Sequence, residues 1–303
     1  MRVLAAAVIL LGLSAQAPGY RAEIDNYRAT RLAELTAPDG WLAVRGLFWL
    51  HEGANTAGSD PASEIRLPPR AAKRLGVFTL AAGQVTFAAD PGAAVTADGK
   101  PITTLAFGRG AEPSIATAGV SLGLIRRADK IGLRMRDPES PNRTGFKGLK
   151  YFPLNPAHRI QAKFTAYDKL KQVPVPNVLG QLVSMESPGF VEFTIKGQSY
   201  RLEPVYETSR HEDLFFIFKD LTSKRETYEA GRFLHTSLPR DGVVDLDFNR
   251  AYNPPCAFTE FATCPLPIKE NQLNVRIPAG ELRFHLPSSS PYQTKSGQLR
   301  PSS

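Results

Sequence analysis

Short apolar runs separated by glycine, proline and aspartate recur roughly every 8 to 15 residues through most of this 303-residue chain. In several runs the apolar side chains alternate with polar ones, as at Ile131, Leu133 and Met135. A spacing of two is typical of half-buried strands, and successive strands without intervening helices are typical of antiparallel sandwiches or barrels. The sequence therefore predicts a mostly β protein, in which Arg134 and Arg136 lie on the outward face of one strand.

One segment near the N-terminus departs from this pattern. Residues 23–36 place their apolar side chains near one helical stripe and end at a Pro-Asp-Gly turn, which predicts a helix. A polar stretch rich in proline and glycine, residues 138–156, is interpreted as the join between two halves. The predicted division is a helix plus an antiparallel β-sandwich at 20–137, a second β-rich barrel or sandwich at 138–286, and a disordered tail at 287–303.

Residues 1–19 have the outline of a secretory signal peptide. One arginine precedes an apolar run from Val3 to Leu13, which is too short to span a bilayer permanently. Ala15-Gln16-Ala17 matches an A-x-A cleavage pattern, but Pro18 disfavours cleavage directly after it. We therefore expect the mature chain to begin at Pro18 or Tyr20, to contain no integral membrane segment, and to be periplasmic or secreted.

Positive charge is concentrated in one part of the chain. The formal net charge is +8, and residues 126–150 contain eight basic residues against three acidic ones. Such a stretch indicates either a solvated basic face or a surface that attracts an anion. Because an exported chain without a recognition motif has no predicted nucleic-acid partner, the expected partner is a small anionic ligand or a component of the cell envelope.

The segment from Asp247 to Leu273 reads DFNRAYNPPCAFTEFATCPLPIKENQL and contains both cysteines of the chain, Cys256 and Cys264. Proline removes a backbone donor and disrupts helices, and it is excluded from central strands. The several prolines of this segment therefore predict a long irregular loop of fixed shape. Ordered loops with many polar groups frequently carry function.

This loop resembles the hallmark of a bacterial family classed as domain of unknown function 1684. Further similarity to the family lies at Gly46–Asp60, Arg134–Pro153 and Phe215–Leu234. The resemblance implies a mostly β protein with these loops as candidate functional surface, and it supplies no activity.

The first half also faintly resembles a forkhead-associated β-sandwich. Residues 53–68 are similar to the opening strand pair of that fold, and residues 95–102 to a later hairpin. Phosphothreonine binding is not implied, because Gly58-Ser59 lacks the expected Gly-Arg pair.

For Cys256 and Cys264, a disulfide is the expected state in an exported protein. Closing a loop of about 9 residues would stabilise the fold by roughly 2.5 kcal/mol. Two buried thiols are one alternative. The other is a redox-active pair, although such pairs usually form a C-x-x-C motif at a helix start, which is not present here.

Strand alternation places Asp245, Asp247 and Asn249 on one face, like the wall of a polar pocket. The alternative is that such side chains bond backbone groups of the irregular loop. Because an arginine fork can bind an anion or a carboxylate, we expect the basic stretch and the loop to share one pocket. The candidate ligand-binding residues are Arg134, Asp137, Arg143, Asp247, Asn249, Arg250, Tyr252, Asn253 and Asn271.

Familiar catalytic patterns receive little support. Residues 119–123 match G-x-S-x-G, but they alternate as a plain strand does, and the helix that a hydrolase elbow requires does not follow. The five histidines have no metal-ligand spacing, so no metal and no cofactor is predicted. Two functions stay open: a cell-envelope binding or scaffold protein with an anion-attracting polar pocket, or a hydrolytic enzyme with its site between 134–143 and 247–271.

Overall fold

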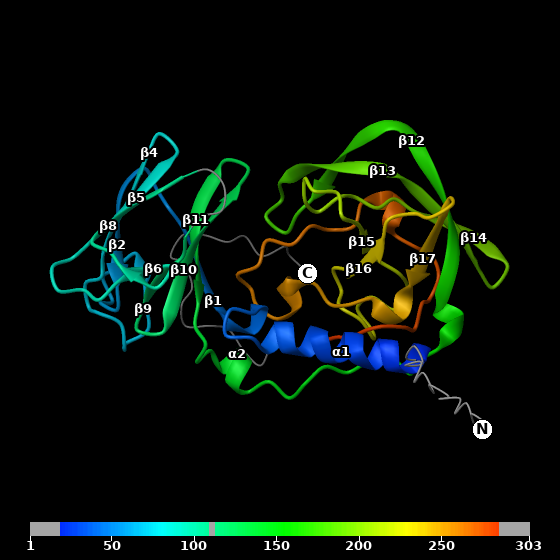
Figure 1. Cartoon of the computed structure of the whole chain (residues 1–303), viewed down its shortest axis with the longest axis horizontal. Helices are drawn as coiled ribbons and strands as arrows, with labels where there is room; N and C mark the ends of the chain where they lie inside the picture. Colours follow the sequence, from blue (N-terminus) through cyan, green and yellow to red (C-terminus); the bar gives the residue numbers. More distant parts are fainter. Residues whose placement is uncertain (1–18, 109–112, 285–303) are drawn as a thin grey trace, which may run out of the picture.

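The computed structural model describes residues 19–108 and 113–284. Within these ranges the protein is mostly β with an N-terminal helix, which confirms the predicted fold class. The molecule is elongated, with the sheets of the first half at one end and those of the second half at the other (Figure 1). The expected tail at 287–303 and the expected signal peptide, except for its last residue, Gly19, lie outside the described residues.

Helix α1 (Tyr20–Thr36) begins three residues before the predicted start and buries Ile24 and Leu35. It ends before Pro38, because proline disfavours a helical conformation in the residue that precedes it. None of the described helices has the length and apolar character that crossing a membrane requires.

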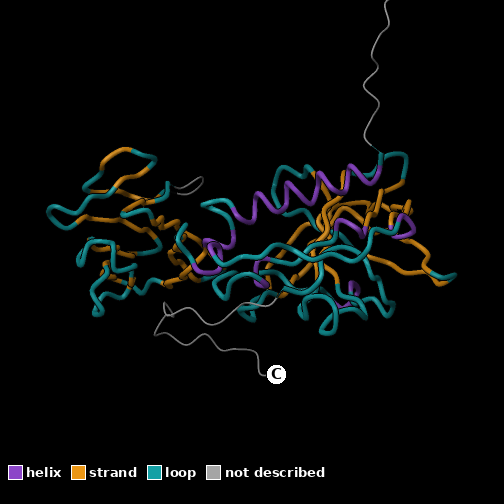
Figure 2. The backbone as a smooth tube through the Cα atoms, turned by 90° about the horizontal axis from the view of Figure 1, so that it is seen from below, coloured by secondary structure: helices purple, strands orange, loops and turns teal. Residues whose placement is uncertain are grey.

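The side chains of α1 bind the second half of the chain. Tyr27 donates a hydrogen bond to the carbonyl of Arg250, and Arg31 forms an ion pair of 3.1 Å with Glu281. The helix accordingly lies along the second half in two perpendicular views (Figures 1 and 2). The grouping of this helix with the first sandwich as one domain stays a prediction, and its polar contacts are with the other half.

Two sheets face each other across one core in the first half. The six-stranded sheet has the order β1-β11-β10-β9-β6-β7 and contains β1 (Val44–Trp49), β6 (Thr96–Ala97), β7 (Lys100–Pro101), β9 (Ile115–Thr117), β10 (Val120–Arg127) and β11 (Lys130–Arg136). The five-stranded sheet has the order β3-β2-β4-β5-β8 and contains β2 (Gly53–Gly58), β3 (Ile65–Arg66), β4 (Gly76–Ala81), β5 (Gln84–Ala89) and β8 (Thr104–Phe107). Phe78 and Phe87 of one sheet pack in the same core as Leu133 and Met135 of the other, so the first half is a β-sandwich.

Two hairpin turns have positive φ at both central residues. Asp98 and Gly99 connect β6 to β7 with φ values of 49° and 76°. Lys196 and Gly197 connect two strands of the second half with φ values of 52° and 79°. Positive φ at both central residues is the backbone that a two-residue hairpin turn of type I′ requires.

The second half contains a four-stranded and a two-stranded sheet. The larger has the order β14-β13-β12-β17 and contains β12 (Arg159–Pro176), β13 (Leu182–Ile195), β14 (Gln198–Leu202) and β17 (Val243–Asp247). The smaller pairs β15 (Asp213–Phe218) with β16 (Arg232–Ser237). The barrel alternative is wrong for the described strands, which close no barrel. Most of residues 248–284 form irregular loops and single turns instead of closing strands.

Short helical turns connect these sheets. They are η1 (Trp41–Ala43), α2 (Pro141–Thr144), η2 (Pro156–His158), η3 (Phe248–Arg250), η4 (Pro255–Ala257) and η5 (Lys269–Asn271). Three of them interrupt the proline-rich loop, so the prediction that this loop is irregular but ordered is confirmed.

The loop covers the outer face of the six-stranded sheet. Val44 and Leu47 on that face pack against Phe261, and the Thr259 hydroxyl donates to the Val44 carbonyl at 3.1 Å. We call this contact, between the outer face of β1, β10 and β11 and residues 256–264, the seam. Arg134 points into it, because its neighbours Leu133 and Met135 face the sandwich core.

Candidate functional site

The sequence predicts that Arg134 and Arg143 meet the loop 247–271 around one pocket, but Arg143 and Asp247 are not brought together. The Tyr20 hydroxyl lies 3.0 Å from both carboxylate oxygens of Asp247, whereas Arg143 Nε donates to the Thr36 carbonyl at 2.7 Å. Tyr20 and Thr36 are the two ends of the 17-residue helix α1. At about 1.5 Å per residue these ends are about 24 Å apart, which exceeds the reach of an arginine. The expectation of one shared pocket is therefore wrong for this pair.

Asp247 and Asn249 hold the start of the loop. Asp247 Oδ1 accepts the backbone N–H of Asn249 at 3.0 Å, and Asn249 exchanges hydrogen bonds with the backbone of Asn155 in both directions. Both side chains are buried. Arg250 lies 3.6 Å from Asp247 and 3.7 Å from Glu23. These contacts correspond to the structural alternative, in which polar side chains satisfy loop backbone and fix the start of α1.

Tyr252 and Asn253 belong to a buried network beneath α1. The Asn253 amide N–H donates to Glu281 at 2.9 Å, and its Nδ2 donates to the Leu282 carbonyl at 2.8 Å. The guanidinium of Arg31 lies over the Tyr252 ring, 4.6 Å from its centroid. Burial raises the pKa of the Tyr252 hydroxyl, so this side chain stays neutral. The network joins helix and loop.

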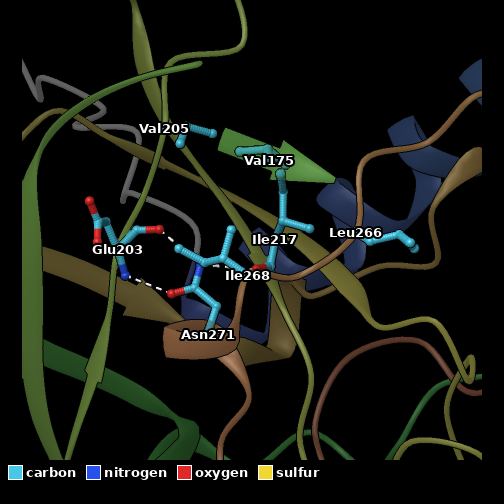
Figure 3. A pocket seen from close by; sticks show the side chains of 7 residues that line it. All are labelled: Val175, Glu203, Val205, Ile217, Leu266, Ile268 and Asn271. Atoms are coloured by element: carbon cyan, nitrogen blue, oxygen red, sulfur yellow. Dashed lines mark hydrogen bonds between the residues drawn. The ribbon is translucent and has the colours of Figure 1, made fainter. Parts of the chain in front are cut away.

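Asn271 fixes two strands from within. Its Nδ2 donates to the carbonyls of Glu203 and Ile217, and its Oδ1 accepts the Glu203 N–H at 2.8 Å. These residues line a cavity of about 10 Å³ (Figure 3), which is about the size of one water molecule. The Glu203 carboxylate is paired with Lys171 at 2.9 Å. Asn271 is thus structural in its contacts.

Asp137 forms its contacts within the first half. Its carboxylate forms an ion pair with Arg70 and accepts the backbone N–H of Glu139. Its own N–H donates to the Ala43 carbonyl at 2.7 Å. Asp137 therefore fixes the end of β11 and does not meet the loop.

Buried side-chain atoms without a hydrogen-bond partner among the described residues occur at three candidates: Arg250 Nε, Asn253 Oδ1 and two donors of Arg134. Arg134 is the one of these three with two unpaired donors and no ion pair to a described carboxylate. Its side chain is 5% exposed, and Nε and Nη2 are buried without a hydrogen-bond partner among the described residues. The guanidinium lies over the Trp41 ring, 5.0 Å from its centroid. The cross-strand neighbours, Leu47 and Gly123, carry no charge. The described part of the chain therefore gives this buried cation no carboxylate partner.

Neighbouring arginines increase the positive potential of the seam. Arg127 donates from Nε to the Thr263 hydroxyl at 2.8 Å, and Arg136 donates to the Asp39 carbonyl. Burial, and secondarily the charges of Arg127 and Arg136, lower the pKa of Arg134 to about 10. Arg134 still carries its charge at neutral pH, at a cost in free energy that an anion would remove.

Cys256 and Cys264 lie side by side at the same seam as free thiols. The predicted disulfide is thus not formed in this structure, and the two cysteines correspond to the alternative of two free thiols. Cys264 Sγ instead accepts the backbone N–H of Cys256 at 3.1 Å. The hydrogen bond with the Cys264 thiol lowers the pKa of Cys256, to which the charge of Arg134 also contributes. Burial raises the pKa of Cys264. The described residues contain no cluster of three or more metal-ligating side chains.

Sequence reasoning missed two residues of the seam, Trp41 and Arg127. Arg127 lies within the basic stretch, but nothing local indicates which of these arginines is buried. Trp41 follows the turn after the helix, and its position over a guanidinium depends on the loop contributed much later by the chain. The alternation at Leu133 and Met135 predicts the inner face correctly, whereas the outward face proves to be covered.

The fold and the seam thus define a two-part, mostly β protein with an arginine-rich contact between a sheet and a cysteine-containing loop. Residues 144–282 match the family described as "Protein of unknown function (DUF1684)". This segment includes the loop from Asp247 to Leu273. The resemblance predicted from the loop is therefore confirmed.

One solved structure that is similar to this chain is the solution NMR structure of an uncharacterized protein of Haloarcula marismortui. It is 28% identical, and the alignment covers 48% of this chain and 80% of the other, with a TM-score of 0.39. No curated protein matches the chain.

Proposed function

We propose that this protein is exported to the periplasm or the medium and there binds a small anion at the seam, with Arg134 as the principal ligand. The observation that carries the proposal is the buried Arg134 guanidinium, whose Nε and Nη2 have no hydrogen-bond partner among the described residues. Buried polar groups in native proteins are almost always paired, so an unpaired cation indicates a missing partner.

The geometry of the free donors favours an oxyanion. Nε and Nη2 lie along one edge of the planar guanidinium, and this edge forms two parallel hydrogen bonds with carboxylate or phosphate oxygens. Trp41 stabilises the positive charge of Arg134, because its ring lies against one face of the guanidinium and leaves the donor edge free. The low exposure of Arg134 restricts the ligand to a compact group such as carboxylate, sulfate or phosphate.

Such a group occurs free or as part of an envelope molecule. The leader at residues 1–19 supports export, and the basic residues near Arg134 support attraction of an anion toward the seam. In an oxidising compartment, Cys256 and Cys264 are also expected to be open to disulfide formation. The hydrolytic alternative receives no such support, since no described histidine forms a hydrogen bond with Arg134, Cys256 or Thr263.

The test is a titration of the mature protein with acetate, sulfate and phosphate at constant ionic strength, followed by calorimetry and thermal unfolding. An anion at about 100 times its Kd stabilises the folded state by about 2.7 kcal/mol. We expect Arg134→Met to abolish this stabilisation and Arg134→Lys to weaken it, because lysine keeps the charge but loses the fork.

Arg66→Met is the matched control. Arg66 is an exposed residue of β3, so its loss removes the same charge far from the seam. Equal anion-dependent stabilisation in the wild type and Arg134→Met would refute the proposal. So would an effect that follows ionic strength alone.

A further inference from the structure

The two cysteines are brought together by the fold across a loop that the local sequence does not mark as a redox motif. Cys256 lies in η4, held by the Tyr228 hydroxyl, which donates to its carbonyl at 3.2 Å. Cys264 lies at the other end of the loop and places its sulfur 3.1 Å from the Cys256 amide. Both belong, together with Trp41, to one hydrophobic cluster.

The environments of the two thiols differ. Cys256 is partly exposed, whereas Cys264 is 5% exposed. The charged Arg134 is close enough to influence the pKa of both groups, and its donor edge has no partner among the described residues. A partly exposed cysteine beside a cation and a second, buried cysteine is the arrangement of an attacking and a resolving cysteine.

We propose that Cys256 and Cys264 are a thiol–disulfide exchange pair, in which Cys256 attacks a small disulfide and Cys264 resolves the resulting mixed disulfide. This activity goes beyond anion binding and does not depend on it. Arg134 acts as a positioning residue that favours the thiolate of Cys256.

The exchange balances in two steps. The Cys256 thiolate attacks one sulfur of the small disulfide, forming a mixed disulfide and releasing the other half as a thiolate. The Cys264 thiol loses its proton and attacks the Cys256 sulfur, which forms the Cys256–Cys264 bond and releases the second half as a thiolate. Two electrons pass from the protein to the small disulfide, and the protons of the two cysteines pass to the released thiolates.

Contacts at the seam favour reversible formation of the Cys256–Cys264 disulfide. In the reduced protein the Cys264 sulfur accepts a hydrogen bond from the Cys256 N–H. This contact stabilises the reduced state, with which the disulfide competes. Disulfides that are strained or accessible are the labile ones, whereas unstrained structural disulfides resist reduction by glutathione.

The experiment places the full mature protein in millimolar buffers of reduced and oxidised glutathione, starting from both the reduced and the oxidised protein. Free thiols are then alkylated and the products mapped by mass spectrometry. We expect the two starting points to converge on the same fraction of Cys256–Cys264 disulfide. Cys264→Ser should accumulate a glutathione adduct on Cys256, and Cys256→Ser should form about tenfold less adduct on Cys264, because burial and pKa both disfavour its thiolate.

The role of Arg134 is measured by the pH dependence of alkylation without added anion. In Arg134→Met the pH midpoint for Cys256 should rise, and the rate at neutral pH should fall about tenfold for each unit of that rise. Arg66→Met should leave both unchanged. Circular dichroism confirms that each variant is folded, and Arg134→Lys, which keeps a charge, should restore part of the rate if Arg134→Met folds poorly.

Three results would overturn the proposal: equal reactivity of the two thiols with an ordinary midpoint for Cys256, a disulfide that glutathione does not reduce, or the absence of any intramolecular disulfide. Each of these can occur while anion binding at Arg134 is retained, so the two proposals fail separately.

Discussion

Replacing Arg134 by methionine should stabilise the protein in the absence of an anion, which is the opposite of what a structural arginine would show. Methionine keeps an unbranched, polarizable side chain against Trp41 and removes the buried charge. Burial lowers the pKa of Arg134 to about 10, whereas an arginine ordinarily titrates above pH 12. At 1.36 kcal/mol per pKa unit, the charged form costs about 3 kcal/mol.

The sign follows from proton linkage. Because the pKa of this cation is lower in the folded state, the unfolded chain binds its proton more tightly. The cost is therefore fully present below pH 10, which includes neutral pH, and it decreases as the pH rises through 10. Loss of the cation–π contact with Trp41 opposes the gain by about 1–2 kcal/mol. The expected net stabilisation by Arg134→Met is about 1–2 kcal/mol.

The assay is urea and thermal unfolding at neutral pH in a buffer without oxyanions, for the wild type, Arg134→Met, Arg134→Lys and Arg66→Met. A gain of 1 kcal/mol should raise Tm by about 2–4 °C in a chain of this size. The difference should reverse when a binding anion is present at saturation. A loss of 3–5 kcal/mol in Arg134→Met, as expected when one partner of a buried ion pair is removed, would refute this reasoning.

Two further predictions concern the N-terminal region of the chain. Tyr20→Phe removes the hydroxyl that binds the Asp247 carboxylate, and it should destabilise by about 1–3 kcal/mol in urea unfolding. Tyr200→Phe, whose hydroxyl is exposed and bonds Gln198, is the control and should change stability by less than about 0.5 kcal/mol; equal effects would contradict a role for Tyr20 in holding the loop. N-terminal sequencing of envelope material should find the mature protein beginning at Pro18 or Tyr20, and an intact Met1 in a cytoplasmic pool would remove the basis for export.

Local pattern was sufficient for much of the fold. The alternation at Leu133 and Met135 identified an inner strand face, and the hairpin similarity of residues 95–102 agrees with the turn at Asp98-Gly99. These features depend on residues near one another in the chain, where strand period and turn chemistry act directly. The prolines after Asn253 likewise determine that the loop is irregular, because they remove backbone donors.

The site was less predictable because it depends on distances that local pattern does not contain. Polar density in two segments suggested that Arg143 and Asp247 meet, yet each binds a different end of α1. A polar side chain in an irregular loop can bind a ligand or form hydrogen bonds with backbone groups of the loop. The identity of the residue does not distinguish these two roles. For Asp247 and Asn271 the structure shows the second role. Arg134 differs because a distant loop covers it without supplying a partner.

This difference between Arg134 and the other candidates is itself an argument for function. Proteins are stable by only about 5–15 kcal/mol, so a single buried charge that costs about 3 kcal/mol is a substantial burden. A substitution to an apolar residue would relieve the cost without disturbing a salt bridge, since the described residues form none with it. Local violations of packing rules of this kind are expected at functional sites, where stability is given up for binding or chemistry. The seam combines that cost with two adjacent thiols, and we therefore place the function of this protein there and not in the polar loop around Asp247, where Arg250 is paired with Asp247 and Glu23.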